Sequence, residues 1–220
     1  MTPPHVDWDG LYRETTRPAY SIGEPQPELA AVIEQGKVRS EVLDAGCGHA
    51  ALSMDLATRG YSVVGLDLSP TAVAAATATA TNRGLTTVSF AATDLTEFTG
   101  YDGRFHTIMD SGCLHSLPVD RRQSYLESLH RAAAPGARLF ILAFSQRAFG
   151  GDAEAPGPNG FTDDEIRATA AAVWTVDEVR PATLYALDTH MDRAPASIVD
   201  AERDDNGRVM MPGFFLGAHK

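Results

Sequence analysis

Two carboxylates and two glycines near the start of the chain are spaced for nucleotide binding. Gly46 and Gly48 follow one short apolar run, which contains Asp44, and Asp67 ends a second run about twenty residues later. This layout predicts a strand, a glycine turn that opens a helix, and a second strand that ends in a carboxylate. Glycines let the backbone approach a ligand, and the helix N-terminus offers free N–H groups. Asp67 is placed to accept hydrogen bonds from both hydroxyls of a ribose.

Asp44 narrows the class of nucleotide. Gly46, Gly48 and Ala51 also satisfy the glycine pattern of dinucleotide enzymes, so the glycines alone leave the ligand open. A carboxylate just before Gly46 would repel a pyrophosphate in a poorly screened cleft, but it suits a ligand with an ammonium group. S-adenosylmethionine (SAM) has an amino group, a sulfonium, a ribose and an adenine, and it has no phosphate.

With these residues the chain resembles the class I SAM-dependent methyltransferases, most closely between Val42 and Pro118. It looks most like actinobacterial, particularly mycobacterial, enzymes associated with benzoquinone-type or heteroaromatic substrates, and more distantly like thiopurine methyltransferases. The resemblance implies a Rossmann-like, seven-stranded sheet with one strand inserted antiparallel at the edge. One departure from the family's acidic-x-Gly-x-Gly-x-Gly pattern is Ala50, which stands at the last glycine.

The resemblance also implies a set of cofactor contacts. Asp94, just past the third strand, matches the acidic residue that faces the adenine amino group, and Leu68 and Leu95 would cover the adenine faces. The backbone of Asp110 and Ser111 should run close to the methionine part of SAM. Asp94 has a plainer interpretation as a turn residue. The expected cofactor-binding residues are Asp44, Gly46, Cys47, Gly48, Asp67, Leu68, Asp94, Leu95, Asp110, Ser111, Trp8, Tyr12 and Tyr20.

His115 is the candidate catalytic residue. Its segment, residues 110–118, resembles the motif beside the transferred methyl in small-molecule methyltransferases, and it lacks the signatures of nucleobase-modifying enzymes. Because the ordinary pKa of histidine lies near neutrality, His115 is expected to act as a general base or as a donor that orients the acceptor. The alternative is a structural histidine, since methyl transfer from a sulfonium often needs only proximity.

The two cysteines, Cys47 and Cys113, are expected to be small apolar fillers rather than nucleophiles. Strands one and four should be neighbours in such a sheet, so the two thiols should lie close together and remain reduced. The seven histidines do not cluster with them at metal-ligand spacing, so no metal site is expected.

Two segments are expected to close over the site. Residues 1–27 form an arm or lid, in which Trp8, Tyr12 and Tyr20 resemble aromatic residues that exclude water from the sulfonium. Packing of these rings on the outside of the domain is the alternative. Residues 145–161 are rich in Gly, Pro and Ala and are expected to form a loop over the substrate side.

Apolar periodicity and capping residues predict the elements that position these residues. Strands are expected near 40–44, 61–66, 87–91, 105–110, 137–144, 173–179 and 213–219. Helices are expected near 7–17, 28–35, 50–59, 70–82, 119–134 and 162–172. Ser69 should cap one helix before Pro70, and Thr162 and Glu165 should form a capping box. The alternation predicts an α/β, doubly wound, mainly parallel sheet with helices on both faces and the ligand at the carboxyl ends of the strands.

Length and composition agree with a single domain over residues 1–220. The chain is 44% hydrophobic, which suffices for a sizeable core. A net charge of −11 disfavours a nucleic-acid partner. No segment has the pattern of a secretion signal or the length of a membrane span, so no membrane partner and a cytoplasmic location are expected.

We predict that the chain transfers a methyl group from SAM to an oxygen, nitrogen or sulfur of a small aromatic or heteroaromatic acceptor, with S-adenosylhomocysteine as the second product. Two alternatives remain. A nicotinamide-dependent oxidoreductase would account for the glycines and Asp67, but not for Asp44 or Asp94. A non-catalytic SAM-binding module would bind the cofactor and leave little room for an acceptor.

Overall fold

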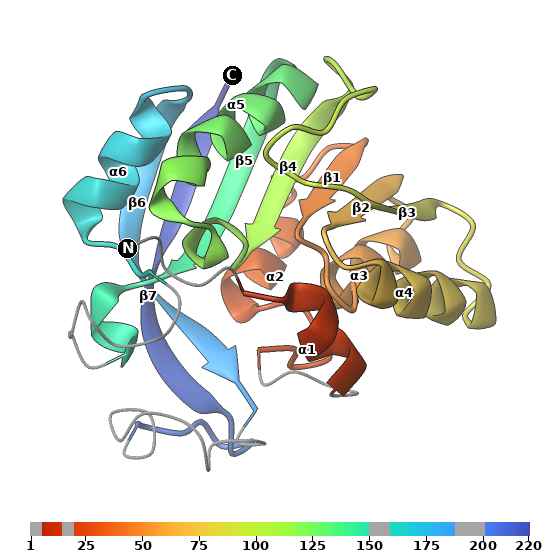
Figure 1. Cartoon of the computed structure of the whole chain (residues 1–220), viewed down its shortest axis with the longest axis horizontal. Coiled ribbons are helices and arrows are strands. Elements are labelled where there is room, and N and C mark those ends of the chain that lie inside the picture. Colours follow the sequence, from red (N-terminus) through yellow and green to blue (C-terminus); the bar gives the residue numbers. More distant parts are fainter. Residues whose placement is uncertain (1–5, 15–19, 150–158, 188–200) are drawn as a thin grey trace.

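A computed structural model describes residues 6–14, 20–149, 159–187 and 201–220. Its strands are β1 (Val42–Ala45), β2 (Val63–Asp67), β3 (Val88–Ala92), β4 (Phe105–Ser111), β5 (Ala133–Phe144), β6 (Thr175–Ala186) and β7 (Val209–His219). In the described residues these seven strands form one sheet in the order β3-β2-β1-β4-β5-β7-β6 (Figure 1). β1 to β5 are parallel, and β7 runs antiparallel to both β5 and β6. The predicted doubly wound, mainly parallel sheet is confirmed, with its antiparallel strand one position inside the edge.

The helices are those that the capping residues predict. They are α1 (Trp8–Glu14), α2 (Pro27–Glu34), α3 (Ala51–Thr58), α4 (Pro70–Asn82), α5 (Arg122–Ala132) and α6 (Asp163–Ala171). The Ser69 hydroxyl accepts a hydrogen bond from the N–H of Ala72 at 3.1 Å and so caps α4. Thr162 and Glu165 form the complete capping box of α6. Short 3-10 turns cover 114–116, 119–121 and 146–149.

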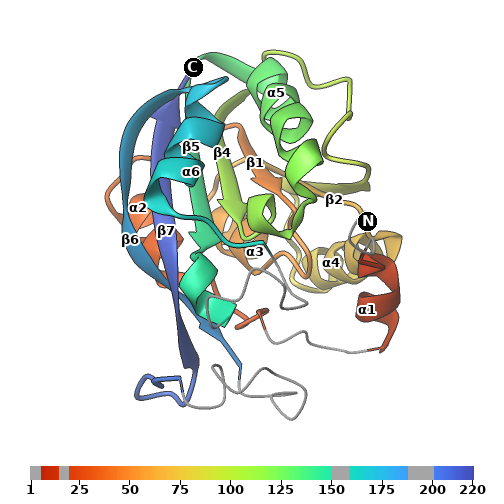
Figure 2. The ribbon, with the colours of Figure 1, turned by 60° about the vertical axis from the view of Figure 1, so that its left-hand side comes forward.

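Helices cover the sheet on both faces, and a core fills each interface (Figures 1 and 2). Leu126 of α5 and Ile166 of α6 pack with Leu43 of the sheet on one face. Leu29 of α2 and Leu56 of α3 pack with the neighbouring Val42 on the other. Consecutive residues of a strand point to opposite faces, so β1 contributes to both cores and has no polar face.

The last two strands are longer than predicted. β7 pairs with β5 only from His219 to Gly213, whereas its pairing with β6 continues to Val209 opposite Ala186. β6 and β7 therefore extend past β5 as a two-stranded ribbon (Figure 1). Pro181 lies inside β6, which is the edge strand, and a proline without an N–H is tolerated there. The proline hid the second half of β6 from the sequence prediction.

Pro135 and Gly136, which fall between the helix expected at 119–134 and the strand expected at 137–144, lie within β5. β5 already pairs with β4 at Ala133, and the register shifts before Arg138 pairs with Thr107. Gly136 has a φ of +69°. The helix predicted to reach residue 134 ends accordingly at Ala132, and the glycine marks an irregularity inside a strand.

Some expected features lie outside the described residues. These are 1–5 and 15–19 of the arm, 150–158 of the expected substrate loop, and 188–200 between β6 and β7. At the two ends of the substrate loop, Ser145 and Phe161 form an isolated bridge. None of the helices in the described part of the chain is long and apolar enough to cross a membrane.

Candidate functional site

The glycine turn between β1 and α3 hydrogen-bonds to the protein itself. The N–H groups of Gly46 and Cys47 donate to the carbonyl oxygen of Leu66 at 2.8 and 3.0 Å, and the N–H of Gly48 donates to Oδ2 of Asp67 at 2.8 Å. The N–H groups of the turn itself are therefore occupied, and any free N–H groups for a ligand would have to come from the start of α3. A pyrophosphate cradle needs such groups, so this turn is not built for a pyrophosphate.

The turn requires unusual backbone angles. Gly46, Gly48 and Ala50 have φ of +75°, +51° and +61°. A Cβ on Gly46 would lie 2.6 Å from Cβ of Cys113, so a side chain there would collide with the segment that follows β4. Ala50 has the left-handed conformation at the N-cap of α3, at a cost of about 1–2 kcal/mol for a residue other than glycine. This explains why the sequence pattern favours a third glycine at Ala50.

Asp44 lies inside β1 and binds the first turn of α3. Its Oδ2 accepts hydrogen bonds from the N–H of Ser53 at 3.1 Å and from the Ser53 hydroxyl at 2.6 Å. The residue is 1% exposed, and burial raises its pKa to about 7. The Ser53 bonds oppose this shift, and the charges of Asp67 and Asp110 add to it.

Asp110 and Asp67 are also buried and held by N–H groups. The Asp110 carboxylate accepts from the N–H groups of residues 112–114 at 2.6 to 3.0 Å and from the Tyr125 hydroxyl at 2.8 Å. Burial raises the pKa of Asp110 to about 6. Oδ1 of Asp67 accepts from the N–H of Ser69 at 2.9 Å, and burial raises its pKa too. The side chain of Asp110 thus fixes the loop after β4.

Asp44, Asp67 and Asp110 together form what we call the acidic site, at the carboxyl ends of β1, β2 and β4. Within the described ranges no lysine or arginine forms an ion pair with any of them. Buried carboxylates without a cation are costly, and a positively charged ligand would relieve that cost. The ammonium and sulfonium of SAM fit this donor set, and a pyrophosphate does not.

The N-terminal arm lies across the glycine turn. The Tyr12 hydroxyl lies directly over Gly48, where a side chain on the glycine would collide with it. The Tyr12 ring meets the His49 ring edge-on at 5.0 Å between centroids. Asp9 binds the start of α4, where its Oδ1 accepts from the Ser69 hydroxyl at 2.7 Å and from the Thr71 N–H at 3.0 Å. These bonds lower the pKa of Asp9.

Two further aromatic residues of the arm lie beside each other. The Trp8 and Tyr20 rings meet edge-on at 6.3 Å between centroids. Tyr12, Tyr20 and Asp67 are close enough for the charge of Asp67 to raise the pKa of both tyrosines, although burial is the larger cause. The structure therefore brings the arm to the acidic site.

The expected adenine contacts are divided between the core and the surface. Oδ1 of Asp94 accepts from the N–H and hydroxyl of Thr96 at 2.8 and 2.7 Å, and Oδ2 pairs with Arg121 at 3.0 Å. Asp94 thus makes the turn that its plainer interpretation predicts. Leu95 is buried in the core, whereas Leu68 is 43% exposed beside the acidic site. An exposed leucine here is available to a flat apolar ligand.

His115 does not have the near-neutral pKa that the sequence suggests. It is 4% exposed, and burial, with a smaller effect of the Arg122 charge, lowers its pKa to about 3. Its Nδ1 accepts a hydrogen bond from the N–H of Phe144 at 3.1 Å, so the proton of the neutral ring is on Nε2. The premise for a general base is therefore corrected: His115 is neutral at physiological pH, and its remaining polar atom is a donor.

Arg122 is the functional candidate that the sequence did not reveal. It is 6% exposed at the start of α5, and its guanidinium lies 4.1 Å from the centroid of the Phe161 ring. It donates to the Asn159 carbonyl oxygen, and its buried Nε has no hydrogen-bond partner among the residues that the structure describes. Burial lowers its pKa to about 10, and it stays charged. Nothing in the sequence distinguishes this arginine from the exposed Arg121 before it.

Comparison with known proteins decides the family. Residues 42–136 match the family described as a methyltransferase domain. The chain is 48% identical over 205 residues to the 2-heptyl-1-hydroxyquinolin-4(1H)-one methyltransferase of Mycobacteroides abscessus, and the alignment covers 93% of this chain and 89% of that protein. This chain belongs to the SAM-dependent methyltransferases.

Solved structures agree with this assignment. One, described for the conversion of a disulfide bond into a thioacetal group during echinomycin biosynthesis, has a TM-score of 0.81 at 31% identity. The match covers 97% of this methyltransferase and 90% of that chain. A Burkholderia thailandensis N1-methyltransferase with bound 1,6-didemethyltoxoflavin and S-adenosylhomocysteine has a TM-score of 0.62 at 21% identity, covering 96% and 82%. The latter shares the fold.

The family settles three of the sequence-based hypotheses. The chain is an enzyme, it uses SAM, and S-adenosylhomocysteine is the product of the donor. The nicotinamide-dependent and non-catalytic alternatives are both excluded. The acidic site of this methyltransferase gives the physical reason, because its buried carboxylates match a cationic donor.

The cysteines of the methyltransferase behave as predicted. Cys47 and Cys113 are both free, and they follow the neighbouring strands β1 and β4. Burial raises the pKa of both thiols, and the charge of Cys113 contributes to the shift at Cys47, so the thiols lie close together and are poor nucleophiles. No cluster of metal-ligating side chains occurs in the part of the chain that the structure describes.

Proposed function

We propose that this methyltransferase acts on an ionisable oxygen, nitrogen or sulfur of a small heteroaromatic acceptor, and that it takes the acceptor as an anion. The name of the Mycobacteroides abscessus relative, a methyltransferase of a 1-hydroxyquinolinone, supports an acceptor of this class. The observation that carries the proposal is Arg122, a buried cation that forms no ion pair in the described part of the chain, although the charge of Glu165 partly offsets the lowering of its pKa.

The surroundings of Arg122 suit a flat anionic acceptor. Phe161 lies under the guanidinium, and His115 and Phe144 have their rings 4.4 Å apart at the ends of β4 and β5. A charged arginine is rarely buried unless it is paired. An acceptor oxyanion would supply the missing charge, and the aromatic rings would cover the apolar part of the acceptor.

The charge of Arg122 replaces a general base. His115 is neutral, its Nδ1 is occupied by the Phe144 N–H, and its pKa is about 3, so it does not take a proton from the acceptor. A nearby guanidinium lowers the pKa of a bound hydroxyl and favours its ionised form. The acceptor therefore loses its proton to solvent before methyl transfer, and Nε2 of His115 orients it as a hydrogen-bond donor.

The acidic site supplies the cofactor contacts in this proposal. Asp44 attracts the ammonium group, Asp67 accepts from the ribose hydroxyls, and the exposed Leu68 covers one face of the adenine. The lone pairs that the N–H groups leave free on Asp67 are sufficient, since each carboxylate oxygen accepts more than one hydrogen bond. Contact of the adenine with Asp94 and Leu95, and of the methionine part with the backbone of 110–111, stays a prediction.

The arm completes the site. When bound, SAM supplies a methyl group that is already activated by its sulfonium. Trp8, Tyr12 and Tyr20 exclude water and offer aromatic faces to a cation. Arg122 holds the acceptor, so the contribution of the protein is chiefly orientation and electrostatics. We further propose a cytoplasmic location, which the two free thiols support, and no nucleic-acid partner, which the charge of −11 supports.

The test compares acceptors of graded acidity. Isotopically labelled SAM is incubated with phenols, N-hydroxyquinolinones, heteroaromatic amines and thiols whose pKa values run from about 5 to 10. We expect kcat/KM to rise with pH through the pKa of each acceptor, with no common inflection near 6.5. Arg122→Met should lower kcat/KM for acidic acceptors about tenfold to a hundredfold and leave the Kd for SAM unchanged.

Arg167→Met, on the exposed side of α6, is the control for loss of an arginine. An inflection near neutral pH that is the same for all acceptors and disappears in His115→Asn would show that His115 is the base after all. Equal activity of Arg122→Met on anionic and neutral acceptors would refute anion recognition, while the methyltransferase assignment would stand.

A further inference from the structure

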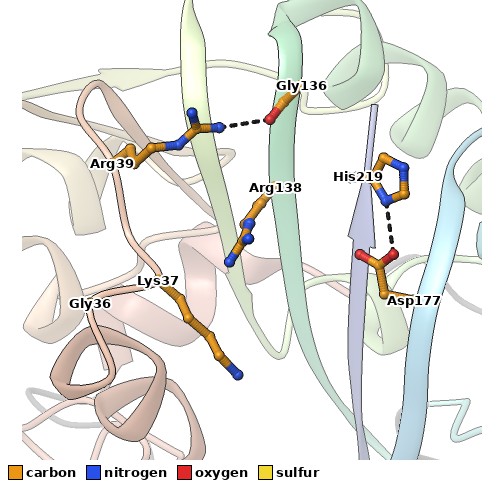
Figure 3. Close-up of a pocket in the computed structure, with 7 residues that line it drawn as sticks. All are labelled: Gly36, Lys37, Arg39, Gly136, Arg138, Asp177 and His219. Carbon is orange, nitrogen blue, oxygen red and sulfur yellow. Dashed lines mark hydrogen bonds and ion pairs between the residues drawn. The ribbon is translucent and has the colours of Figure 1, made fainter.

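A polar pocket lies at the opposite edge of the sheet from the acidic site. Its volume is about 560 Å³, and it is lined by Gly36, Lys37, Arg39, Gly136, Arg138, Asp177 and His219 (Figure 3). We call it the basic pocket. Its residues come from the segment before β1, the start of β5, the start of β6 and the end of β7. At this edge the parallel strands begin, so the pocket is separate from the methyl-transfer site.

Three cations and one carboxylate line the basic pocket. Lys37 and Arg138 extend from opposite walls toward the same space, as Figure 3 shows. In the described residues no hydrogen bond or ion pair engages the Lys37 ammonium or the Arg138 guanidinium. Asp177 is bound at 2.8 Å to Nδ1 of His219, on the far side of the pocket. Clustered like charges repel one another, and an anion between them would relieve the repulsion.

The walls of the basic pocket are held in place. The backbone N–H of Arg39 donates a hydrogen bond to the hydroxyl of Thr107 in β4 at 2.9 Å. Its guanidinium donates to the carbonyl oxygen of Gly136 in β5 at 2.7 Å. Arg138 and His219 are partners in the register of β5 and β7, so their side chains emerge on the same face.

The other wall is shaped by an irregularity in β6. The register of β6 shifts between Val176 and Glu178, which leaves Asp177 out of the regular pairing. A bulge of this kind redirects a side chain, and here the carboxylate is directed to His219. Because Asp177 accepts from Nδ1, Nε2 of a neutral His219 ring is an acceptor, so the donors to an anion in this pocket are Lys37, Arg39 and Arg138.

We propose that the basic pocket binds the phosphate dianion of a small molecule. Three cations against one carboxylate leave an excess of two positive charges, which matches a doubly charged phosphate. Arginine and lysine are the side chains that bind phosphate by charge-assisted hydrogen bonds. The volume lies in the range of small-molecule sites, so the pocket has room for a phosphate ester as well as for the free ion.

A macromolecular polyanion fits this surface less well. A nucleic acid needs a basic stripe that follows its backbone, and the cations here converge on one concave site in a chain of net charge −11. The ligand that fits this pocket is therefore a small molecule with its negative charge on one group. Its binding leaves the acidic site open, so it does not compete with SAM.

Isothermal titration calorimetry of the full chain tests the proposal. Inorganic phosphate and ribose 5-phosphate are titrated at constant ionic strength, with chloride as the reference anion. We expect saturable binding with a Kd on the order of 1 mM or tighter. Arg138→Gln and Lys37→Gln should each weaken binding about tenfold. Arg83→Gln, at the end of α4, removes the same charge outside the pocket and should leave binding unchanged.

The two ligands distinguish the possible sources of phosphate. Equal affinity would identify free phosphate as sufficient, and tighter binding of the ester would identify a phosphorylated small molecule. No saturation by either ligand, or equal weakening by Arg138→Gln and Arg83→Gln, would overturn the proposal. Circular dichroism checks that the variants are folded, and an unchanged Kd for SAM in Arg138→Gln checks that the two sites are independent.

Discussion

The two edges of the same sheet carry opposite charge. At the carboxyl edge, Asp44, Asp67 and Asp110 are buried, and their raised pKa values show the cost of burial without a cation. At the amino edge, Lys37 and Arg138 are directed into an open pocket. The difference lies in solvent access: carboxylates at the first edge are desolvated before any ligand arrives, whereas the cations at the second are still hydrated.

This contrast predicts how strongly substitutions and pH change ligand binding at each edge. A desolvated charge interacts more strongly with a counter-charge than a hydrated one does. We therefore expect large effects of substitution and pH at the acidic site, and smaller, salt-sensitive effects at the basic pocket. The following predictions compare the edges, from the largest effect to the smallest.

Asp67→Asn should weaken SAM binding the most. It removes a charge that is hydrogen-bonded in the glycine turn, and we expect the Kd for SAM to rise about tenfold to a hundredfold. Asp177→Asn makes the same change at the opposite edge and should leave this Kd unchanged. Calorimetric titration with SAM measures both, and a similar loss of affinity in both variants would mean that net charge, not the acidic site, governs binding.

SAM affinity should increase with pH. The raised pKa values of Asp44, about 7, and Asp110, about 6, mean that these carboxyls are partly protonated in the free protein. Their contribution to stability is greatest below the unfolded pKa and is lost as pH rises toward 7. A bound cation favours the ionised forms, so SAM binding releases protons.

We expect the Kd for SAM to fall by up to about tenfold per pH unit between about 6 and 7, the limit for one proton released. Calorimetry in buffers of different ionisation enthalpy counts the protons. Asp44→Asn, which keeps an oxygen for Ser53, should reduce this pH dependence. A flat profile in the unmodified enzyme would show that the acidic site is already ionised.

Asp9→Ala should loosen the arm. The carboxylate binds the first turn of α4 through Ser69 and Thr71, so its loss removes the arm's hydrogen bonds to that helix. We expect the KM for SAM to rise about threefold to tenfold and hydrogen exchange in 8–14 to become faster. Asp7→Ala is the matched control, since Asp7 binds the N–H of Gly10 within the arm. Equal effects of the two substitutions on the KM for SAM would mean that the stability of α1, and not its contact with α4, is what matters.

The smallest effect concerns backbone strain at the two edges. Ala50 and Gly136 both have positive φ, at +61° and +69°. Ala50→Gly should stabilise the protein by about 0.5–1 kcal/mol, because relief of the left-handed alanine exceeds the added entropy of the unfolded chain. Gly136→Ala should destabilise it by a similar amount, since a Cβ there meets no atom within 4 Å and only the conformation is costly. Urea unfolding measures both.

The sequence predicted the fold better than the state of the site. Periodicity and caps such as Ser69 and Thr162 identified the helices because these signals are local. The second half of β6 was missed because its stability comes from pairing with β7 and not from its own residues, among them Pro181. Strand pairing of this kind is set by tertiary structure.

In the candidate site, residue types were visible but environments were not. Asp44 and Asp67 could be named as candidate site residues because their spacing to the glycines can be read directly from the sequence. The pKa of His115 was mispredicted, since it depends on burial in the folded protein, where the ring of Phe144 from β5 packs against it, and on the charge of Arg122. Arg122 was missed for the same reason: its burial and the unpaired state of its Nε among the described residues are properties of the folded protein.

One residue, Ser69, links the arm to the acidic site. Its N–H donates to Asp67, and its hydroxyl donates to Asp9. Any shift of this serine with the arm would be felt at Asp67, so we expect SAM binding and the position of the arm to be thermodynamically linked. By reciprocity, whatever factor closure adds to the affinity for SAM, SAM adds to the closure equilibrium.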